Sequence, residues 1–459
     1  MNVIFVILLI INIIAFVYIL LSNTVSLVQL LSSSVSLSRF NRSRYYLEHK
    51  RYLDSENMIP ITLMVAAQNE EKTILSTVAN LLSLDFPEYE VIIINDGSTD
   101  QTLQKLIERF NLVAVRQPIK VSIPTKEVKA VYRCPDYPGL VVLDKEQGGV
   151  GDALNAGINA SRYPVYVAID ADSLLEKESL VKIIMPFVKD HRVVGVGGIV
   201  RVATGYEIVN GELVEAGTPR RPLINFQTIE YLRTFLTGSL GCDAMGILLN
   251  VSGAFGAFRK KSVIDVGGYT TDGFGVGMEL VVKLHQDLLE KEAPYVIKFI
   301  PDPVCWVHPP KKMKDLYRQR KTWQTETINS LTSHKKMLFN PKYKRIGMLA
   351  MPYYWLFEVI GPFLDIIGYI TIPLSFALGI VSLNFMVSFL VIALLYGIVL
   401  SVGSLILEED MVQKYPARGH FSTLSFYALL ENIGYQQYTS LMRIAATFTY
   451  KRNKRTLGK

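Results

Sequence analysis

The sequence predicts an α/β domain with a Rossmann-like, mostly parallel sheet, flanked by transmembrane and interfacial α-helices. Three observations carry this prediction. Short apolar runs typical of strands alternate with helical periodicity through the middle of the chain. Polar residues follow several of these runs, and both ends of the chain are long and apolar. With 19% charged residues and a mean hydropathy of +0.26, the chain is too apolar for an ordinary soluble enzyme.

The N-terminal segment is predicted to be a membrane anchor. Residues 2–31 are almost wholly apolar, which is much longer than the core of a signal peptide. A basic stretch follows at 39–51. Because Lys and Arg gather on the cytoplasmic side of membrane spans, the domain after this stretch is expected in the cytoplasm.

The middle of the chain alternates strand and helix patterns. Residues 60–67 and 89–94 read as buried strands, each followed by a polar turn and a helix. The remaining expected elements are strands at 141–143, 165–169, 193–200 and 296–300, a polar loop or hairpin at 206–221, helices at 225–240 and 278–288, and a glycine-rich segment at 252–259 suited to close backbone approach to a ligand.

Two carboxylates, Asp170 and Asp172, directly follow the strand at 165–169. Ligands of open α/β sheets bind at the carboxyl ends of strands, where two such acids can hold a divalent cation and, through it, phosphate oxygens. An acid after a strand can equally start a turn or cap a helix. A third acid, Asp96, ends the strand at 89–94 and precedes Gly97, so several strand ends bring polar groups to one edge.

The C-terminal third is predicted to lie on and in the membrane. A basic amphipathic helix at about 312–333 is expected on the membrane surface. The apolar stretch 346–407 allows two long spans or three short ones. Within it, Glu358 and Asp365 are candidates either for lining a channel or for a headgroup boundary. The expected divisions are an N-terminal transmembrane helix at 1–38, a cytoplasmic domain at 39–308, interface helices at 309–343, a membrane region at 344–447 and a basic cytoplasmic tail at 448–459.

Charge and cysteine usage exclude other classes. The net charge is +7, but the basic residues crowd beside apolar spans, which argues for a membrane surface and against nucleic acid. The three cysteines lack metal-ligand spacing and fit a reducing compartment. A transporter or channel is disfavoured because the strand–helix domain is too large and regular.

The order of these motifs resembles the processive family-two membrane glycosyltransferases, which include the cellulose, hyaluronan, chitin and poly-N-acetylglucosamine synthases. The resemblance covers nearly the whole chain, from Gln-Asn-Glu-Glu at 68–71 to the last membrane region. It implies a GT-A-type domain and inverting transfer of a sugar from a UDP-sugar to a growing polysaccharide or glycan. It also implies a bacterial plasma membrane location, lipid contact and other subunits of a synthase complex.

The resemblance also implies roles for individual residues. Asp170 and Asp172 correspond to the acids that hold Mg²⁺ or Mn²⁺ on the diphosphate, and the 252–258 run corresponds to the segment along the acceptor path. The nucleotide neighbours are then Ala66, Asn69, Glu70, Asp96 and Asp170, and the acceptor and diphosphate contacts are Gln319, Arg320, Trp323, Phe255 and Gly256.

The sequence departs from the family where the catalytic base is expected. Val276 and Gly277 stand in place of a Glu-Asp pair, and only Glu279 of that acidic motif is kept. A glycine cannot accept a proton from the acceptor hydroxyl. Three other positions also depart from the family pattern, namely Val150 for a lysine, Thr322 for the Arg of Gln-x-x-Arg-Trp, and Val307-His308 for Thr-Glu.

Two functions therefore stay open. In the first, the protein is an active glycosyltransferase in which Asp272 or Glu279 replaces the missing base. In the second, it binds a nucleotide without turnover and acts as partner or regulator of an active synthase. His308 is interpreted as a core or loop histidine.

Overall fold

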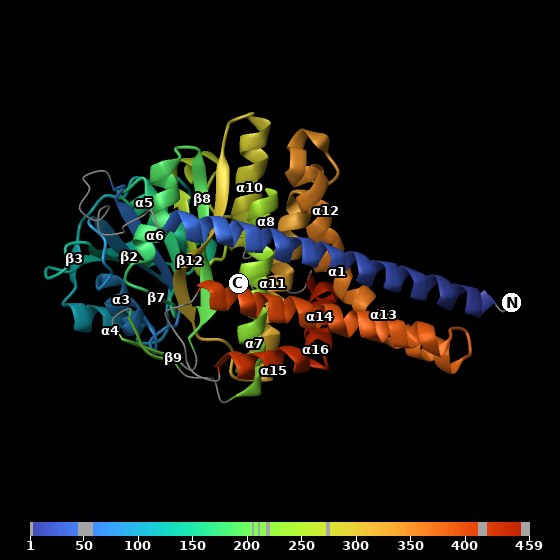
Figure 1. Cartoon of the computed structure of the whole chain (residues 1–459). Coiled ribbons are helices and arrows are strands. Elements are labelled where there is room, and N and C mark those ends of the chain that lie inside the picture. The colour runs from blue at the N-terminus through green and yellow to red at the C-terminus, as the bar shows by residue number, and fades with distance from the viewer. Residues whose placement is uncertain are drawn as a thin grey trace.

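The computed structural model describes residues 3–44, 58–203, 206–209, 212–216, 221–271, 276–411 and 420–450. It shows a globular α/β part from which a bundle of long helices extends to one side (Figure 1). The extension contains the N-terminal end of α1 (Val3–Arg44), α13 (Gly361–Ala377) and the N-terminal part of α14 (Leu383–Met411). We call this extension the stalk.

The described strands form a ten-stranded sheet and a separate hairpin. The order in the sheet is β3-β4-β5-β2-β1-β6-β11-β8-β12-β7, and β9 pairs with β10. The strands are β1 (Ile61–Ala67), β2 (Tyr89–Asp96), β3 (Val113–Val115), β4 (Val128–Arg133), β5 (Leu140–Lys145), β6 (Val165–Asp170), β7 (Leu174–Leu175), β8 (Val193–Val202), β9 (Tyr206–Val209), β10 (Glu212–Ala216), β11 (Phe255–Arg259) and β12 (Val296–Val307).

The centre of the sheet is parallel and buried on both faces. Strands β5, β2, β1 and β6 pair in parallel, as their continuous apolar sequences predict. Side chains of β1 alternate between two cores: Leu63 and Val65 pack with the core of α3, α4 and α6, whereas Met64 packs with that of α5 and α10. This layering brings the carboxyl ends of four neighbouring strands to one edge.

Strand β11 was not predicted from the sequence. The segment expected to be an irregular glycine-rich run instead forms a strand between β6 and β8, antiparallel to both. The sheet is therefore mixed, with a parallel centre and antiparallel additions. The pattern was missed because the short run of small residues and phenylalanines has no clear strand periodicity.

The helices cover both faces of the sheet and build the membrane side. They are α1, α3 (Ile74–Leu82), α4 (Thr102–Phe110), α5 (Val150–Ala160), α6 (Ser179–Lys189), α7 (Pro222–Leu232), α8 (Leu240–Met245), α9 (Lys260–Asp265), α10 (Val276–Glu290), α11 (Met313–Ser333), α12 (Met351–Tyr353), α13, α14, α15 (His420–Leu430) and α16 (Tyr435–Phe448). Arg233–Ser239, Ile346–Ala350 and Tyr354–Ile360 are π-helical, and Lys335–Met337 and Pro341–Tyr343 are short 3₁₀ turns.

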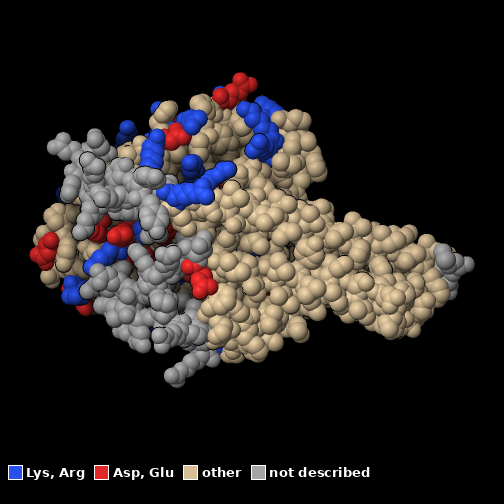
Figure 2. All heavy atoms as spheres, viewed as in Figure 1, with Lys and Arg blue, Asp and Glu red and all other residues tan. Residues whose placement is uncertain are grey.

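Three of the described helices are long and apolar enough to cross a membrane: Val3–Arg42, Ile346–Ala377 and Leu383–Glu409. At 1.5 Å per residue, the 42 residues of α1 extend about 63 Å, roughly twice the ~30 Å hydrocarbon core. The far half of α1 therefore runs along the globular part, where Ser33 Oγ donates a hydrogen bond to the Thr237 carbonyl at 3.0 Å. In Figure 2 the surface of the stalk carries no visible charge.

The basic helix α11 was predicted to lie on the membrane surface, and the structure shows what it packs against within the protein. One of its faces is buried, including Leu316, Gln324, Ile328 and Leu331, and the helix packs against α16 and α10. Lys314 and Arg318 are exposed on the outer face of this helix, whereas Arg320 is buried.

Candidate functional site

Parallel register places the predicted nucleotide and metal residues at one edge of the sheet. Ala66 of β1 lies opposite Asp170 of β6 on one side and opposite Ile94 of β2 on the other. Asp96 at the end of β2 lies opposite Lys145 at the end of β5. The strand ends expected from the sequence are therefore adjacent in space.

Three carboxylates gather where β1 and β6 end. Burial, then the charges of Asp172 and Glu70, raise the pKa of Asp170 to about 7. Burial also raises the pKa of Asp172, against the opposing effects of its own backbone N–H and of His308. The pKa of Glu70 is raised by burial and by Asp172 and Asp100, and is lowered by a hydrogen bond from Thr73. Each negative charge thus destabilises the others.

Asp170 is nevertheless exposed to water. Solvent therefore limits the effect of desolvation on this group, and the neighbouring carboxylates are the firmer cause of its raised pKa. An exposed carboxylate held beside two other acids is suited to meet a cationic ligand.

The carboxylates do not form a complete metal cage. Among the described residues, no group of three or more His, Cys, Asp or Glu side chains is arranged to hold a metal ion. Mg²⁺ bound with phosphates commonly takes only one or two protein carboxylates, the other ligands being water and phosphate oxygens. Asp170 and Asp172 fit that kind of donor set, and their raised pKa values show charge that a cation would neutralise.

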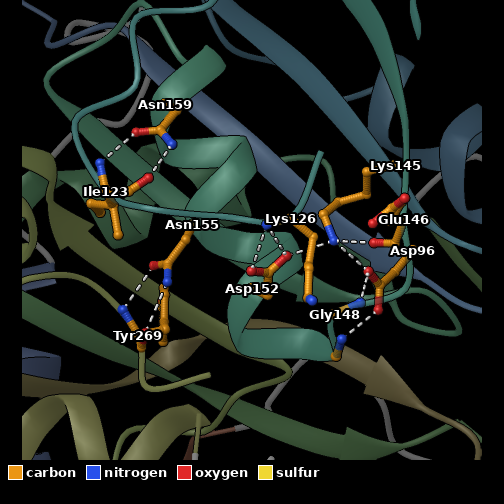
Figure 3. Close-up of polar contacts among 11 residues, drawn as sticks. Asp96, Ile123, Lys126, Lys145, Glu146, Gly148, Asp152, Asn155, Asn159 and Tyr269 are labelled. Carbon is orange, nitrogen blue, oxygen red and sulfur yellow. Dashed lines mark hydrogen bonds and ion pairs between the residues drawn. The ribbon is translucent and has the colours of Figure 1, made fainter. Parts of the chain in front are cut away.

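Asp96 is held by the protein itself (Figure 3). Its carboxylate accepts hydrogen bonds from the backbone N–H groups of Gly148 at 2.9 Å and Gly149 at 2.7 Å. Lys145 Nζ lies 2.7 Å from the same carboxylate and 2.6 Å from Asp152 Oδ1. Asp96 is only 2% exposed, and its carboxylate holds the paired-glycine turn in place. Little of its surface is left for the predicted contact with a nucleotide.

Lys145 and Asp152 were missed by the sequence reasoning. Lys145 has no exposed surface, and Asp152 also accepts a bond from the Lys126 backbone N–H at 3.0 Å. A lysine that ends a mostly apolar strand, with an acid seven residues later, was the available signal. A buried lysine almost always needs a paired acid.

Asn69 ties the loop after β1 to the loop after β2. Its φ of +59° lies in the left-handed region, which asparagine tolerates better than most residues. The Asn69 side-chain oxygen accepts hydrogen bonds from the backbone N–H groups of Thr99 at 2.8 Å and Asp100 at 3.3 Å. The next residue, Glu70, donates its backbone N–H to Thr102 Oγ1 at 2.8 Å. These bonds hold the backbone of Glu70 in its position beside Asp170 and Asp172.

The predicted acceptor residues of β11 lie beside the acids but differ in what they expose. Phe255 is opposite Ile169, the residue before Asp170, and Gly256 is opposite Ala168. Phe255 is fully buried in the core, so its ring does not line an open path. A Cβ at Gly256 would stand 2.8 Å from Val251 Cγ1, so this glycine serves close packing.

Gln319 and Trp323 of helix α11 both contact Tyr231 of α7, which feels the charge of Asp170. Burial raises the pKa of Tyr231, which is hydrogen-bonded to Gln319 and senses the charges of Arg320 and Asp170. Trp323 is 41% exposed, and its ring lies 6.2 Å from that of Tyr231. Tyr231 belongs to the site and was not singled out from the sequence, because a tyrosine in an apolar helix carries no distinguishing pattern.

Arg320 points to a different set of partners. Its Nη2 donates to Glu230 at 2.7 Å, and its guanidinium lies 4.3 Å from the centre of the Trp323 ring. Tyr435 of α16 donates to the same Glu230 carboxylate at 2.7 Å. Arg320 therefore links α11, α7 and α16, although a diphosphate contact was expected for it.

Glu279, one of the two residues predicted to supply a base, is buried at the start of α10. Glu279 is 4% exposed, and its Oε1 lies 3.4 Å from Nε2 of His334, the residue that ends α11. Its Oε2 has no hydrogen-bond partner among the described residues. A Cβ at Gly277 would stand 2.4 Å from the Val251 carbonyl oxygen. Asp272 lies outside the described residues.

His308 is exposed in the loop that follows β12, so of the two predicted alternatives, a core or a loop histidine, the structure shows the loop. Near this residue β12 pairs with β7 in antiparallel register, Cys305 with Leu175 and Trp306 with Leu174. Continued by two residues, this register brings His308 opposite Asp172, consistent with the effect of His308 on the pKa of Asp172.

Comparison with known proteins agrees with this arrangement. Residues 62–263 match the family described as glycosyl transferase family 2. The chain is 27% identical over 286 residues to the poly-beta-1,6-N-acetyl-D-glucosamine synthase of Staphylococcus aureus, covering 61% of this chain and 57% of that protein. The synthase of the same name from Staphylococcus epidermidis is 28% identical over 269 residues, covering 57% of this chain and 53% of the relative. The chain thus matches little more than half the length of these relatives.

A solved structure shares the fold over most of the chain. The mannosyltransferase from Pyrobaculum calidifontis, in complex with GDP-Man and Mn²⁺, superposes with a TM-score of 0.54 at 16% identity, covering 94% of this chain and 99% of that one. The fold is of the GT-A type, with helices that can cross a membrane. The match to glycosyl transferase family 2 falls on residues 62–263, the part of the chain that contains the acidic edge of the sheet.

Proposed function

We propose that the protein is a membrane-bound inverting glycosyltransferase that takes a sugar from a UDP-sugar and adds it to a growing polysaccharide or glycan. The observation that carries the proposal is the cluster of Glu70, Asp170 and Asp172 at the ends of β1 and β6, inside a family 2 domain. The Staphylococcus relatives are named for a polymer of N-acetylglucosamine, which makes UDP-N-acetylglucosamine the first donor to test.

Asp170 and Asp172 are proposed to hold Mg²⁺ or Mn²⁺ against the donor diphosphate. A bound divalent cation would stabilise the negative charge that develops on the leaving diphosphate. Asn69 and Glu70 are proposed to contact the nucleotide from the loop after β1, with Ala66 beneath it. Gln319 and Trp323, which contact Tyr231, are proposed to meet the sugar and its acceptor.

A second function, a nucleotide-binding partner or regulator of an active synthase, is favoured by the start of α10. Gly277 has no room for a side chain against Val251, and Glu279 is buried against His334. The acceptor hydroxyl thus lacks an evident base among the described residues of this helix. The two candidates share the nucleotide site and differ only in turnover.

One experiment separates them. The full chain, purified in lipid nanodiscs with Mn²⁺ or Mg²⁺, is given radiolabelled UDP-sugars, beginning with UDP-N-acetylglucosamine. Incorporation into a glycan supports the first function. UDP binding without turnover for any donor supports the second.

Asp172→Asn tests the nucleotide site common to both functions. The substitution removes one metal-binding charge and should abolish metal-dependent UDP binding, measured by calorimetry. Asp136→Asn, at an exposed position lining a separate hollow beside β5, is the matched control. An unchanged affinity in Asp172→Asn would show that the cation binds elsewhere.

A further inference from the structure

A turn between α11 and α12 combines free positive charge with exposed apolar side chains. Residues 335–349, here called the basic turn, include five basic residues and no acidic one. The five are exposed: Lys335, Lys336, Lys342, Lys344 and Arg345. Phe339 is 66% exposed, Met348 42% and Leu349 55%. Neither the sugar chemistry nor the core explains this combination.

The inward side of the basic turn is firmly anchored. Met337 and Tyr343 are buried, and the Tyr343 hydroxyl donates to Glu290 of α10 at 2.7 Å. The Phe339 backbone N–H donates to the Gly347 carbonyl at 3.1 Å, which closes the turn. A Cβ at Gly347 would stand 2.5 Å from the Asn340 carbonyl oxygen, so only glycine permits this closure. The outward side chains are therefore presented by a rigid support.

The exposed side chains are held in a costly backbone conformation. Phe339 has a φ of +54° and Lys344 a φ of +49°, values that residues with large side chains rarely adopt. Strain of this kind persists where the surrounding structure enforces it, and it concentrates at functional positions. Here it turns one aromatic and one cationic side chain away from the core.

Most of the positive charge is not neutralised by the protein. Lys336 pairs with Glu290 at 2.9 Å, and Arg345 donates to the Met245 carbonyl at 3.3 Å. Lys335, Lys342 and Lys344 form no ion pair with any residue that the structure describes. An anionic partner outside the chain would neutralise the charges of these three ammonium groups.

The position of the basic turn identifies that partner. The apolar segment Ile346–Ala377, long enough to cross a membrane, begins within it. Figure 1 shows α12 beside α1 where the stalk leaves the globular part, and Figure 2 shows Lys and Arg bordering the uncharged surface there. Cations at a membrane surface attract anionic headgroups, and an aromatic ring beside them inserts at the headgroup level.

We propose that the basic turn is a binding surface for anionic lipid headgroups. Lys335, Lys342 and Lys344 meet the phosphates, while Phe339, Met348 and Leu349 enter the interface between headgroups and acyl chains. This contact fixes the distance of the GT-A domain from the bilayer. It is independent of whether the domain transfers sugar.

The test measures membrane depth at Phe339. Phe339→Cys carries a nitroxide label in the full chain, in nanodiscs of phosphatidylcholine alone or with phosphatidylglycerol; the native cysteines are buried. We expect the label to be more accessible to oxygen than to a water-soluble nickel chelate, and deeper with phosphatidylglycerol. Met348→Cys is a second reporter that leaves Phe339 in place. Val121→Cys, 68% exposed between β3 and β4, should remain accessible to nickel in both nanodiscs.

Charge variants complete the test. Lys342→Gln with Lys344→Gln should abolish the deepening caused by phosphatidylglycerol. Lys120→Gln with Lys129→Gln removes the same charge from exposed positions on the β3–β4 side and should change nothing. The proposal would be overturned if the labels at 339 and 348 stayed in water in both nanodiscs. It would also be overturned if their depth did not change with phosphatidylglycerol.

Discussion

Lys145 determines how the first strand ends are arranged. Its ammonium group, with no exposed surface, lies between Asp96 and Asp152, which are 2% and 4% exposed. Breaking a buried ion pair leaves uncompensated charge in a poorly solvated place. The local geometry of the Gly148–Gly149 turn therefore depends on one lysine.

The first prediction removes this lysine. Lys145→Met should lower the free energy of unfolding by about 3–5 kcal/mol, because two buried carboxylates lose their partner. Thermal and denaturant unfolding of the purified chain measure the effect. Lys72→Met, at an exposed lysine, is the control and should change stability little. A loss as small as in that control would mean that water already solvates the two acids.

The second prediction concerns Asp170. Its pKa of about 7 lies above the ordinary value, so the folded state binds its proton more tightly than the unfolded state does. The contribution of this group to stability is therefore present below pH 4 and is lost as pH rises to 7. In metal-free buffer Asp170→Asn should stabilise the protein at pH 8 but not at pH 4, by at most about 1 kcal/mol because the site is exposed.

Thermal unfolding in EDTA at the two pH values measures this difference. Glu70→Gln removes a neighbouring charge and should act in the same direction, with a smaller effect. Equal effects of Asp170→Asn at pH 4 and pH 8 would show that the carboxylates do not repel one another.

At the scale of elements, the start of α10 is packed so closely that position 277 has no room for a side chain. Gly277 approaches the Val251 carbonyl in the segment before β11. The insertion of β11 beside β6 fixes this segment against the sheet. Close backbone packing thus surrounds position 277, where the resemblance predicts an acid.

The third prediction uses this packing. In an unconstrained helix Gly→Ala is stabilising by roughly 1 kcal/mol. Gly277→Ala should have the opposite sign and cost about 1–3 kcal/mol, because its Cβ meets backbone and not a flexible side chain. Gly253→Ala, where no atom lies within 4 Å of an added Cβ, is the control. Stabilisation by Gly277→Ala would mean that α10 moves easily, and an acid at 277 would then be tolerated.

At the scale of the whole molecule, polar contacts attach the globular part to the membrane helices. Arg443 of α16 contacts Glu358 through Nη2 at 2.5 Å and donates from Nε to Gln324 of α11 at 2.9 Å. Arg233 likewise pairs with Glu431 at 2.5 Å. Glu358, considered for lining a channel, is thus engaged in joining helices.

The fourth prediction removes the first of these contacts. Arg443→Met should destabilise the protein by about 1–3 kcal/mol and loosen α16, because a charged carboxylate and an amide lose their donor. Thermal unfolding in detergent and limited proteolysis near α16 measure the change. Arg116→Met, at an exposed arginine, is the matched control. Identical behaviour of the two variants would show that apolar packing alone holds α16.

The sequence by itself predicted the strands that end at the acidic edge, the long apolar helices and the resemblance to family-two glycosyltransferases. These features depend on local apolar patterns and on motifs read along the chain, and Asp170, Asp172 and Glu70 were found in this way. Tertiary structure alone decided that β11 enters the sheet, that Lys145 neutralises Asp96, that Tyr231 joins the site and that Glu279 is buried. Each of these depends on contacts between residues distant in the chain, whose partners no local pattern specifies.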